Sequence, residues 1–295
     1  MVTNDFNNPN GGNPYEHNNE QLIDRETVNN YTLEDYGLTV DALKINHFGI
    51  QVTDPRTGEE LPEAFYKAKI EQAVAQVEKM LDIVILPRYV QEHHDFHRND
   101  FDSFMFIHTH RRPIVQMERI RMEYGGSSIY EYPTKWWRVN KLPGHIEMLP
   151  TLMLSSEGTN LSVSNIYSGY PMIAGIPSLV GNNNYAPQLF HVEYVAGMLP
   201  PTRRGVTQPH EMHADLWTLI IKVALKEVLQ QWGRLIIGAG IASMSVSIDG
   251  VSQSIDTTQS AMYGGASADI MQIDRDIADL LPALRSYYGM NLGLI

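Results

Sequence analysis

The segment after Pro209 carries apolar residues at helical spacing on nearly every side. Residues three and four positions apart form one stripe, which consists of Met212, Leu216, Leu219, Ile220, Val223 and Ala224. A second set widens that stripe, namely Trp217, Ile221, Leu225 and Val228. A helix that is apolar nearly all round is normally covered on several sides. The segment therefore predicts a helix that is buried on several sides, and Gly233 is placed to end it.

Two other segments have the pattern of a helix with a single apolar face. The first runs from Pro62 to about Ile83, and its face consists of Ile70, Ala73, Val74, Val77, Met80, Leu81 and Val84. The second begins at Ser267, and its face consists of Ile270, Ile273, Ile277, Leu280, Leu284 and Tyr287. Pro62 suits a first helical turn. Pro282 should kink or split the second helix, because an interior proline costs ~3 kcal/mol.

Residues 98–205 have a different texture, with Pro, Gly and Asn between short runs of alternating polarity. In residues 118–124, Ile120 and Met122 alternate with charged residues. In residues 189–196, apolar residues at the even positions alternate with His191 and Glu193. A period of two predicts strands with one apolar face, so His191 and Glu193 are expected on the opposite face. This stretch is therefore expected to be mostly β.

Between the last two predicted helices, residues 243–256 have the pattern of a tight hairpin. Asp249-Gly250 is a favoured two-residue turn, and it pairs Ile248 with Val251 and Met244 with Ile255. One face of the hairpin is then apolar. The other is a strip of hydroxyls formed by Ser245, Ser247, Ser252 and Ser254. This strip is either an ordinary exposed face or a surface where charge would be harmful, such as the wall of a passage.

Together these patterns predict an α+β fold built on a helical-bundle core. The core consists of residues 31–97 and 206–295 and carries the hairpin, and residues 98–205 form a β-rich insertion. Residues 1–30 are rich in asparagine and poor in aliphatic residues, which favours disorder. We expect a flexible N-terminal arm there, either a disordered leader or a segment that orders against a partner.

The composition excludes several classes of function. Lys and Arg number 22 and Asp and Glu 34, so the formal net charge is −12, which argues against broad neutralisation of nucleic-acid phosphates. The densest cationic cluster is Arg111, Arg112, Arg119 and Arg121, followed by Lys135–Arg138, but alternation on a solvated strand face explains Arg119 and Arg121. The absence of cysteine excludes disulfides and thiolate ligands. No apolar run is long enough to span a bilayer, so no membrane contact is expected.

A group of histidines is the strongest candidate for chemistry. His93, His94 and His97 lie near Asp95, Asp100 and Asp102, and His108 and His110 follow. Neutral imidazoles and carboxylates hold Zn, Ni or Cu. The spacing matches no closed structural site, and the segment is expected to be a polar loop between helix and strand. We therefore expect no metal, and keep a metal-dependent enzyme as the alternative from another class.

Other possible motifs lack the neighbouring residues or elements that their chemistry requires. His210, Glu211 and His213 lack the histidine pair four residues apart that zincin proteases need. Gly238 and Gly240 lack the third glycine and the following helix of a dinucleotide site. No G-x-S-x-G turn is present. The sequence predicts no catalytic residues and no cofactor, and hence a protein that is not an enzyme.

Several runs, taken in order, resemble the head-to-tail adaptor (connector) proteins of tailed bacteriophages. The helix end Glu78–Ile83, followed by Leu86-Pro87, is similar to that family's signature of leucine, aspartate and a hydrophobic residue. Arg112–Ile120 looks like its proline-led strand. Further runs resemble larger phage neck proteins, and these are His191–Gly197, Gly238–Ser243, Ser247–Ser254 and Leu284–Tyr288. The resemblance covers residues 60–125 and 190–290.

The resemblance implies a structural protein of the virion neck, assembled in the host cytoplasm. Family members commonly form twelve-fold rings beneath the portal, extend the DNA channel without binding DNA specifically, and contact the next neck or tail protein. A C-terminal tail often reaches the portal, and here it would comprise Tyr287, Tyr288, Met290, Leu292, Leu294 and Ile295, unless it packs on its own bundle. The hairpin would line the channel or touch a neighbouring subunit through Ser245, Ser247, Asp249, Gly250, Ser252 and Ser254. A neck or tail protein that contacts other tail components is the alternative within this class.

Overall fold

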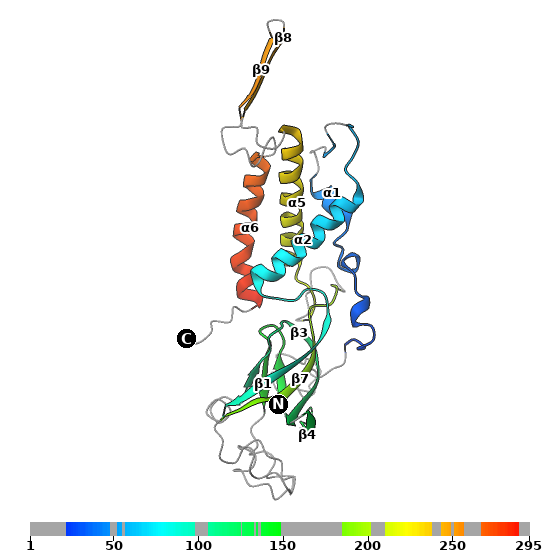
Figure 1. The fold of residues 1–295 in the computed structure, drawn as a ribbon, viewed down its shortest axis with the longest axis vertical. Coiled ribbons are helices and arrows are strands. Elements are labelled where there is room, and N and C mark those ends of the chain that lie inside the picture. Colours follow the sequence, from blue (N-terminus) through cyan, green and yellow to red (C-terminus); the bar gives the residue numbers. More distant parts are fainter. Residues whose placement is uncertain are drawn as a thin grey trace, which may run out of the picture. The chain divides into compact units, whose positions relative to one another are not determined.

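The computed structural model describes residues 22–47, 52–54, 57–97, 106–124, 126–132, 134, 137–148, 185–201, 210–237, 243–248, 251–256 and 267–288. The fold is α+β, with helices and antiparallel sheets (Figure 1). The chain divides into two compact units. We call Thr32–Ile85 with Pro200–Leu294 the helical unit, and Met1–Tyr31 with Leu86–Leu199 the β unit.

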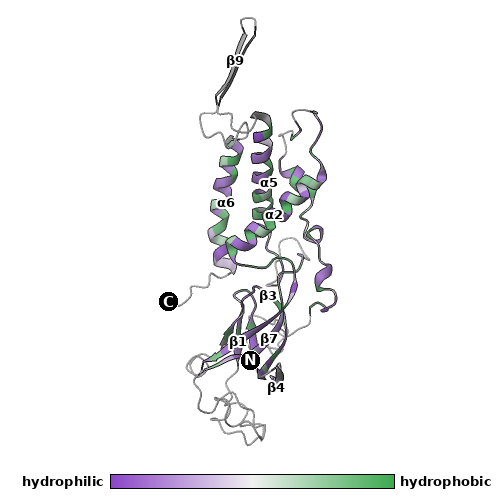
Figure 2. Cartoon of the chain, viewed as in Figure 1, coloured by the Kyte–Doolittle hydropathy of each residue, from purple (hydrophilic) through white to green (hydrophobic). Residues whose placement is uncertain are grey.

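The helical unit is organised around α5, which spans Ala214–Ile237. Helices α1 (Val40–Asn46), α2 (Glu63–Leu81) and α6 (Ser267–Tyr288) all contact it. Its most deeply buried residues include Leu216, Leu219, Ile220, Ala224, Val228 and Leu229. The prediction of a helix buried on several sides is therefore confirmed. Figure 2 shows hydrophilic and hydrophobic residues interleaved along α6, as expected for a helix with one apolar face.

Three details of the helices differ from the prediction. Gly233 does not end α5, which continues to Ile237; a glycine inside a helix costs only ~1 kcal/mol. The split that was one of the two effects expected of Pro282 does not occur, since α6 is one helix from Ser267 to Tyr288. Met80 was expected in the apolar face of α2, yet it is 41% exposed.

Polar contacts also join the elements of the helical unit. Lys222 and Lys226 of α5 form ion pairs of 2.6 Å with Asp276 and Asp274 of α6. The indole of Trp232 donates a hydrogen bond of 2.9 Å to the carbonyl of Thr53. These contacts fix α5 to its neighbours at several points along its length.

The hairpin forms with the predicted pairing. Strands β8 (Ser243–Ile248) and β9 (Val251–Asp256) make a two-stranded sheet of their own. The register pairs Ile248 with Val251, Val246 with Gln253 and Met244 with Ile255. The expected turn, Asp249-Gly250, lies outside the described residues.

The β unit contains two antiparallel sheets. The larger has the strand order β1-β7-β3-β4. Its strands are β1 (Arg88–His97), β7 (Tyr185–Ala196), β3 (Ile114–Tyr124) and β4 (Ser127–Glu131). The smaller has the order β2-β6-β5, formed by β2 (Phe106–His108), β6 (His145–Met148) and β5 (Trp137–Asn140). The stretch predicted to be β is therefore largely β where it is described.

Strand β1 is the main departure from the predicted organisation. Residues 88–97 were expected to close the helical core with a polar loop, but they pair with β7 from Arg88↔Ala196 to His97↔Tyr185. The structure therefore divides the chain between Ile85 and Leu86 and not after residue 97. The pairing joins segments that are far apart in the sequence, so no local pattern around residue 90 reveals it.

The burial of β7 does not follow the predicted alternation of apolar and polar residues. Residues 189–196 are all buried, including His191 and Glu193. The face that carries these two residues also carries Val195, which packs with Val115 and with Ile23 and Val28 from the N-terminal segment. Both faces of β7 are therefore covered within the β unit.

The predicted flexible arm is ordered over residues 22–30. The side-chain oxygen of Gln116 accepts hydrogen bonds of 2.8 and 2.9 Å from the N–H groups of Leu22 and Ile23. Its amide donates one of 2.8 Å to the carbonyl of Ile23. Val28 is buried at the start of a short 3-10 helix, Val28–Asn30. Two buried aliphatic residues and a buried amide thus anchor this segment, whereas residues 1–21 lie outside the described residues.

Candidate functional site

Strand β1 carries polar residues on both of its faces. Glu92 and His94 are two residues apart and share one face, whereas His93 lies on the other. His93 is paired with His191 of the neighbouring strand β7. Because side chains alternate along a strand, two separate clusters form, one on each face of the same sheet.

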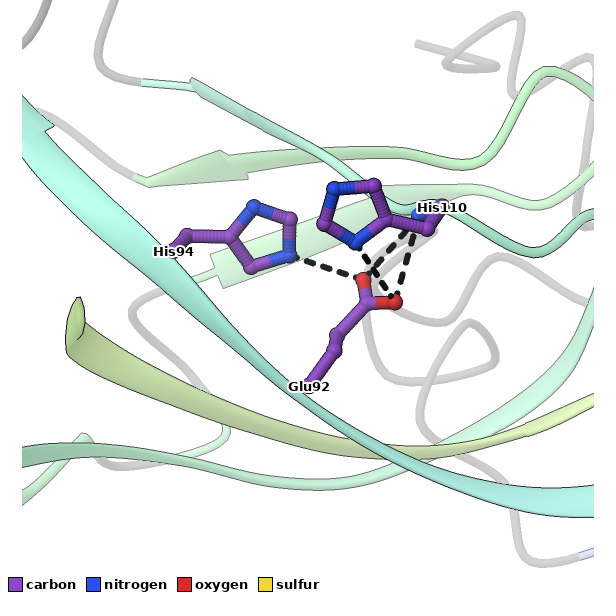
Figure 3. Close-up of side chains that lie close together, drawn as sticks. All are labelled: Glu92, His94 and His110. Carbon is purple, nitrogen blue, oxygen red and sulfur yellow. Dashed lines mark hydrogen bonds and ion pairs between the residues drawn. The ribbon is translucent and has the colours of Figure 1, made fainter.

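The first cluster, here called the Glu92 cluster, consists of Glu92, His94 and His110. The Nε2 atom of His94 lies 2.7 Å from Oε1 of Glu92, and Nδ1 of His110 lies 3.1 Å from Oε2. The two rings stack with centroids 4.8 Å apart. Figure 3 shows both imidazoles directed at the one carboxylate. Two nitrogen atoms and a carboxylate oxygen therefore converge within 4.8 Å of one another.

Other groups hold the carboxylate of Glu92 in place. The backbone N–H of His110 donates to both of its oxygens, at 3.1 and 3.2 Å. The hydroxyl of Tyr194 donates to Oε2 at 3.0 Å and accepts the N–H of Arg111. Burial and the neighbouring carboxylate of Glu92 raise the pKa of Tyr194, so this hydroxyl remains a donor. The carboxylate is thus oriented by groups that are not themselves candidate ligands.

Burial and partners act in opposite directions on Glu92, which is only 8% exposed. Burial raises the pKa of its carboxyl, since the charged form is desolvated. The hydrogen bond and charge of His94, with the donors of His110 and Tyr194, outweigh burial and leave the pKa below its ordinary value. Glu92 is therefore an ionised carboxylate inside the β unit, which requires a positive or donating partner.

The second cluster, here called the Glu123 cluster, consists of His93, Glu123 and His191. Nδ1 of His191 lies 2.9 Å from Oε1 of Glu123, and Nε2 of His93 lies 3.5 Å from Oε2. The two rings stack with centroids 4.5 Å apart. This cluster adjoins Arg121, whose Nη2 lies 2.8 Å from Nδ1 of His191 and 3.3 Å from Oε1 of Glu123. Arg121 also pairs with the buried Glu193.

The two clusters differ in how their charge is balanced. In the Glu123 cluster, a guanidinium lies beside the carboxylate and the imidazole, so a fixed cation supplies the positive charge. In the Glu92 cluster, the groups that lower the carboxyl pKa are the imidazole of His94 and neutral donors. Both offer a ligand set of two nitrogens and one oxygen, but only the Glu123 cluster has an arginine among its recorded contacts within the described residues.

The predicted histidine group is only partly brought together. His94 and His110 lie in the Glu92 cluster and His93 in the Glu123 cluster. His97 contacts Tyr185 instead, and His108 contacts His145. Asp95 accepts hydrogen bonds from the backbone N–H of Gln188 and the hydroxyl of Tyr185. Asp100 and Asp102 lie outside the described residues.

Sequence reasoning missed Glu92, Glu123 and His191. The signal for Glu92 was its two-residue spacing from His94, which matters only if residues 88–97 form a strand. Glu123 and His191 come to His93 from β3 and β7, and no spacing in the sequence connects them. Whether Glu123 and His191 lie beside His93 therefore depends on strand pairing.

The other sequence motifs have structural explanations in the described residues. The ring nitrogen Nδ1 of His213 accepts the N–H of Asp215 at the start of α5, and Glu211 is buried. Arg119 and Arg121 both pair with Glu193, and Arg112 is buried. Gly238, Gly240, Lys135 and Trp136 lie outside the described residues.

Of the residues predicted to contact the portal or a neighbouring subunit, only some belong to the described part of the chain. The hairpin register sets Ser245 opposite Ser254 and Ser247 opposite Ser252. Tyr288 is buried within the helical unit, where its hydroxyl accepts the N–H of His213 at 3.4 Å, and Tyr287 is half-buried beside the ring of His213. Tyr288 thus packs on its own bundle, which was the second alternative for this tail. Met290, Leu292, Leu294 and Ile295 lie outside the described residues.

Within the described residues, no helix has the length and apolar character needed to cross a bilayer. No protein-family model matches the chain, and no curated protein sequence is significantly similar to it.

Proposed function

We propose that this protein is a non-catalytic structural component of a phage neck, a head-to-tail adaptor that assembles as a ring beneath the portal. In this role twelve copies extend the DNA channel, and the next neck or tail protein binds below them. The proposal begins with the resemblance carried by residues 60–125 and 190–290. It includes a helical-bundle core into which the β-rich domain is inserted, and a final location in the virion after assembly in the host cytoplasm.

The hairpin β8–β9 is the observation that carries the proposal. It is a two-stranded sheet of its own, inserted between α5 and α6. An isolated two-stranded ribbon is marginally stable in water, and further strands or a packed surface are needed to stabilise it. Along β8 the sequence alternates Met244, Val246 and Ile248 with serines, a pattern that predicts one apolar row and one row of serines. Neighbouring copies in a ring supply the cover that the apolar row needs.

The charge of the chain fits a conduit for DNA. A net charge of −12 repels phosphate, and a row of serines adds a neutral, hydrogen-bonding surface. A passage lined in this way lets a duplex move without holding it. Specific DNA binding is not part of the proposal.

The first test is the mass of the purified protein, alone and mixed with the portal protein from the same genome. Native mass spectrometry gives the number of copies, and negative-stain images give the shape of any particle. We expect a portal-bound ring with many copies. A protein that stays monomeric and does not bind the portal would exclude this placement, and the next partner to test would be a tail component.

A pair of hairpin variants tests the observation itself. Val246→Asp places a charge in the apolar row and should abolish the ring while the far-UV circular dichroism stays unchanged. Ser247→Ala, on the opposite row, should leave the mass of the ring unchanged. A Val246→Asp ring of normal mass would show that the hairpin is not a subunit contact.

A further inference from the structure

We propose that the Glu92 cluster is a binding site for one divalent transition-metal ion, with Zn²⁺ as the ion that tests it. The ligands are Oε1 or Oε2 of Glu92, Nε2 of His94 and Nδ1 of His110. The site lies in the β unit and is independent of the ring proposed above. An ion there links strand β1 to the segment that leads into β3.

The spacing of the three ligand atoms fits such an ion. In a tetrahedral site zinc binds histidine nitrogen and carboxylate oxygen at about 2.0–2.2 Å, so neighbouring ligand atoms lie about 3.3–3.6 Å apart. In the Glu92 cluster the nitrogen–oxygen separations are 2.7 Å for His94 and 3.1 Å for His110, and all three ligand atoms lie within 4.8 Å of one another. Rotations of the three side chains therefore have to bring these atoms to the separations that an ion requires.

The surroundings hold these ligands in position. Glu92 and His94 are fixed on one face of a paired strand. His110 follows the buried Thr109, whose N–H and hydroxyl both donate to the carbonyl of Gly144 at 3.0 Å. Gly144 has a φ of 75°, and a Cβ there would lie 2.4 Å from the Thr109 hydroxyl, so only glycine fits. Tyr194 and the N–H of His110 keep their bonds to Glu92 when the imidazoles bind an ion, as outer donors do in metal sites.

The site is open on one side. The side chain of His110 is 68% exposed, whereas those of His94 and Glu92 are 14% and 8% exposed. Water therefore reaches the cluster and completes the coordination of an ion held by three protein ligands. Ion binding requires both facing nitrogens to be unprotonated, so affinity should fall on acidification.

The Glu123 cluster is the closest competitor, and its charge argues against it. Arg121 lies 2.8 Å from Nδ1 of His191, the nitrogen that would bind the ion. A metal ion there would face a guanidinium at contact distance. That cluster is better described as part of an ion-pair network that continues through Arg121 to Glu193 and Arg119.

The test is a Zn²⁺ titration of tag-free full-length protein after chelator treatment, followed by calorimetry and by metal analysis after dialysis. We expect one ion per chain and an increase of about 3–6 °C in the unfolding midpoint at tenfold excess over the dissociation constant. His110→Ala should weaken binding at least tenfold. It removes an exposed side chain, so the fold should survive, and circular dichroism checks this.

Two variants serve as matched controls. His97→Ala removes an exposed histidine of β1, the strand that carries Glu92 and His94, and should leave the affinity unchanged. His93→Ala removes a ligand of the competing cluster and should also leave it unchanged. The proposal is overturned if the wild-type chain binds no Zn²⁺, if His110→Ala binds as tightly as the wild type, or if His93→Ala removes the binding.

Discussion

Gln116 connects the N-terminal segment to the sheet through a single buried amide. Its side chain makes hydrogen bonds with both the N–H and the carbonyl of Ile23, and accepts the N–H of Leu22. An amide offers a donor and an acceptor together, and this is what the edge of an extended backbone requires. Residues 22–31 are therefore held by a specific polar contact as well as by the burial of Ile23 and Val28.

Gln116→Leu should lower the free energy of unfolding by about 2–4 kcal/mol, because it leaves three backbone groups without their partner in a buried place. Urea denaturation measures this loss, and limited proteolysis should show earlier cleavage near residue 22. Glu26→Gln, an exposed change in the same segment, is the control and should be neutral. Equal stability of Gln116→Leu and wild type would contradict the anchoring role.

Glu92 should make the stability depend on pH. A carboxyl with a lower pKa in the folded than in the unfolded chain contributes stability above its unfolded pKa, and that contribution is lost as the pH falls through the folded pKa. The pKa of Glu92 lies below its ordinary value of 4.5, so stability should decline on acidification below that pH. Glu92→Gln should be less stable at pH 7 and should show a flatter decline. If the stabilities of the variant and the wild type fell in parallel as the pH is lowered, the decline would be due to other groups.

At the scale of the element, α5 and α6 are joined by ion pairs and by apolar contact, and the two differ in strength. The pairs Lys222–Asp276 and Lys226–Asp274 are partly exposed, and such pairs contribute about 0–1 kcal/mol each. Ile270 is fully buried, as is Ala224 on α5. The apolar face therefore dominates the packing of α6, and the ion pairs mainly select its register.

Ile270→Ala should cost about 2–4 kcal/mol, because truncation in a packed core loses both burial and contacts. Met271→Ala changes the next residue of the same helix, which is 42% exposed, and should cost less than about 0.5 kcal/mol. Chemical denaturation followed by the helical circular dichroism signal compares the two. A similar loss in both variants would show that helix propensity, and not packing, controls α6.

At the scale of the whole molecule, two units each have their own buried residues. The core of the helical unit includes Leu43, Tyr66 and Leu219, and that of the β unit includes Ile120, Tyr194 and Val195. Compact units with separate cores generally unfold as separate cooperative transitions. Ile270→Ala in the helical unit and Gln116→Leu in the β unit therefore report on different parts of the chain.

Differential scanning calorimetry should resolve two transitions in the full-length chain. Ile270→Ala should shift only the transition of the helical unit, and Gln116→Leu only that of the β unit. If either variant moved one common transition, the two units would have to unfold together.

Local pattern was enough to predict α2, α5, α6 and the hairpin pairing. Apolar residues three and four positions apart indicate the helices, and a two-residue turn indicates the hairpin. Each of these signals lies within one short segment of the chain. The arm over residues 22–30 and the strand β1 needed partners that come from distant segments, Gln116 in β3 and the whole of β7. No periodicity near either segment contains that information.

The Glu92 cluster also depends on partners from distant segments of the chain. The sequence contains an unusual group of histidines, and this was visible at once. Which of them meet a carboxylate depends on alternation along a strand and on the segment that brings His110 to it, so His94 and His110 lie together whereas His97 and His108 do not. Short-range pattern therefore determines the helices and the hairpin, and long-range strand pairing decides the chemistry, because a sheet joins residues that the chain keeps far apart.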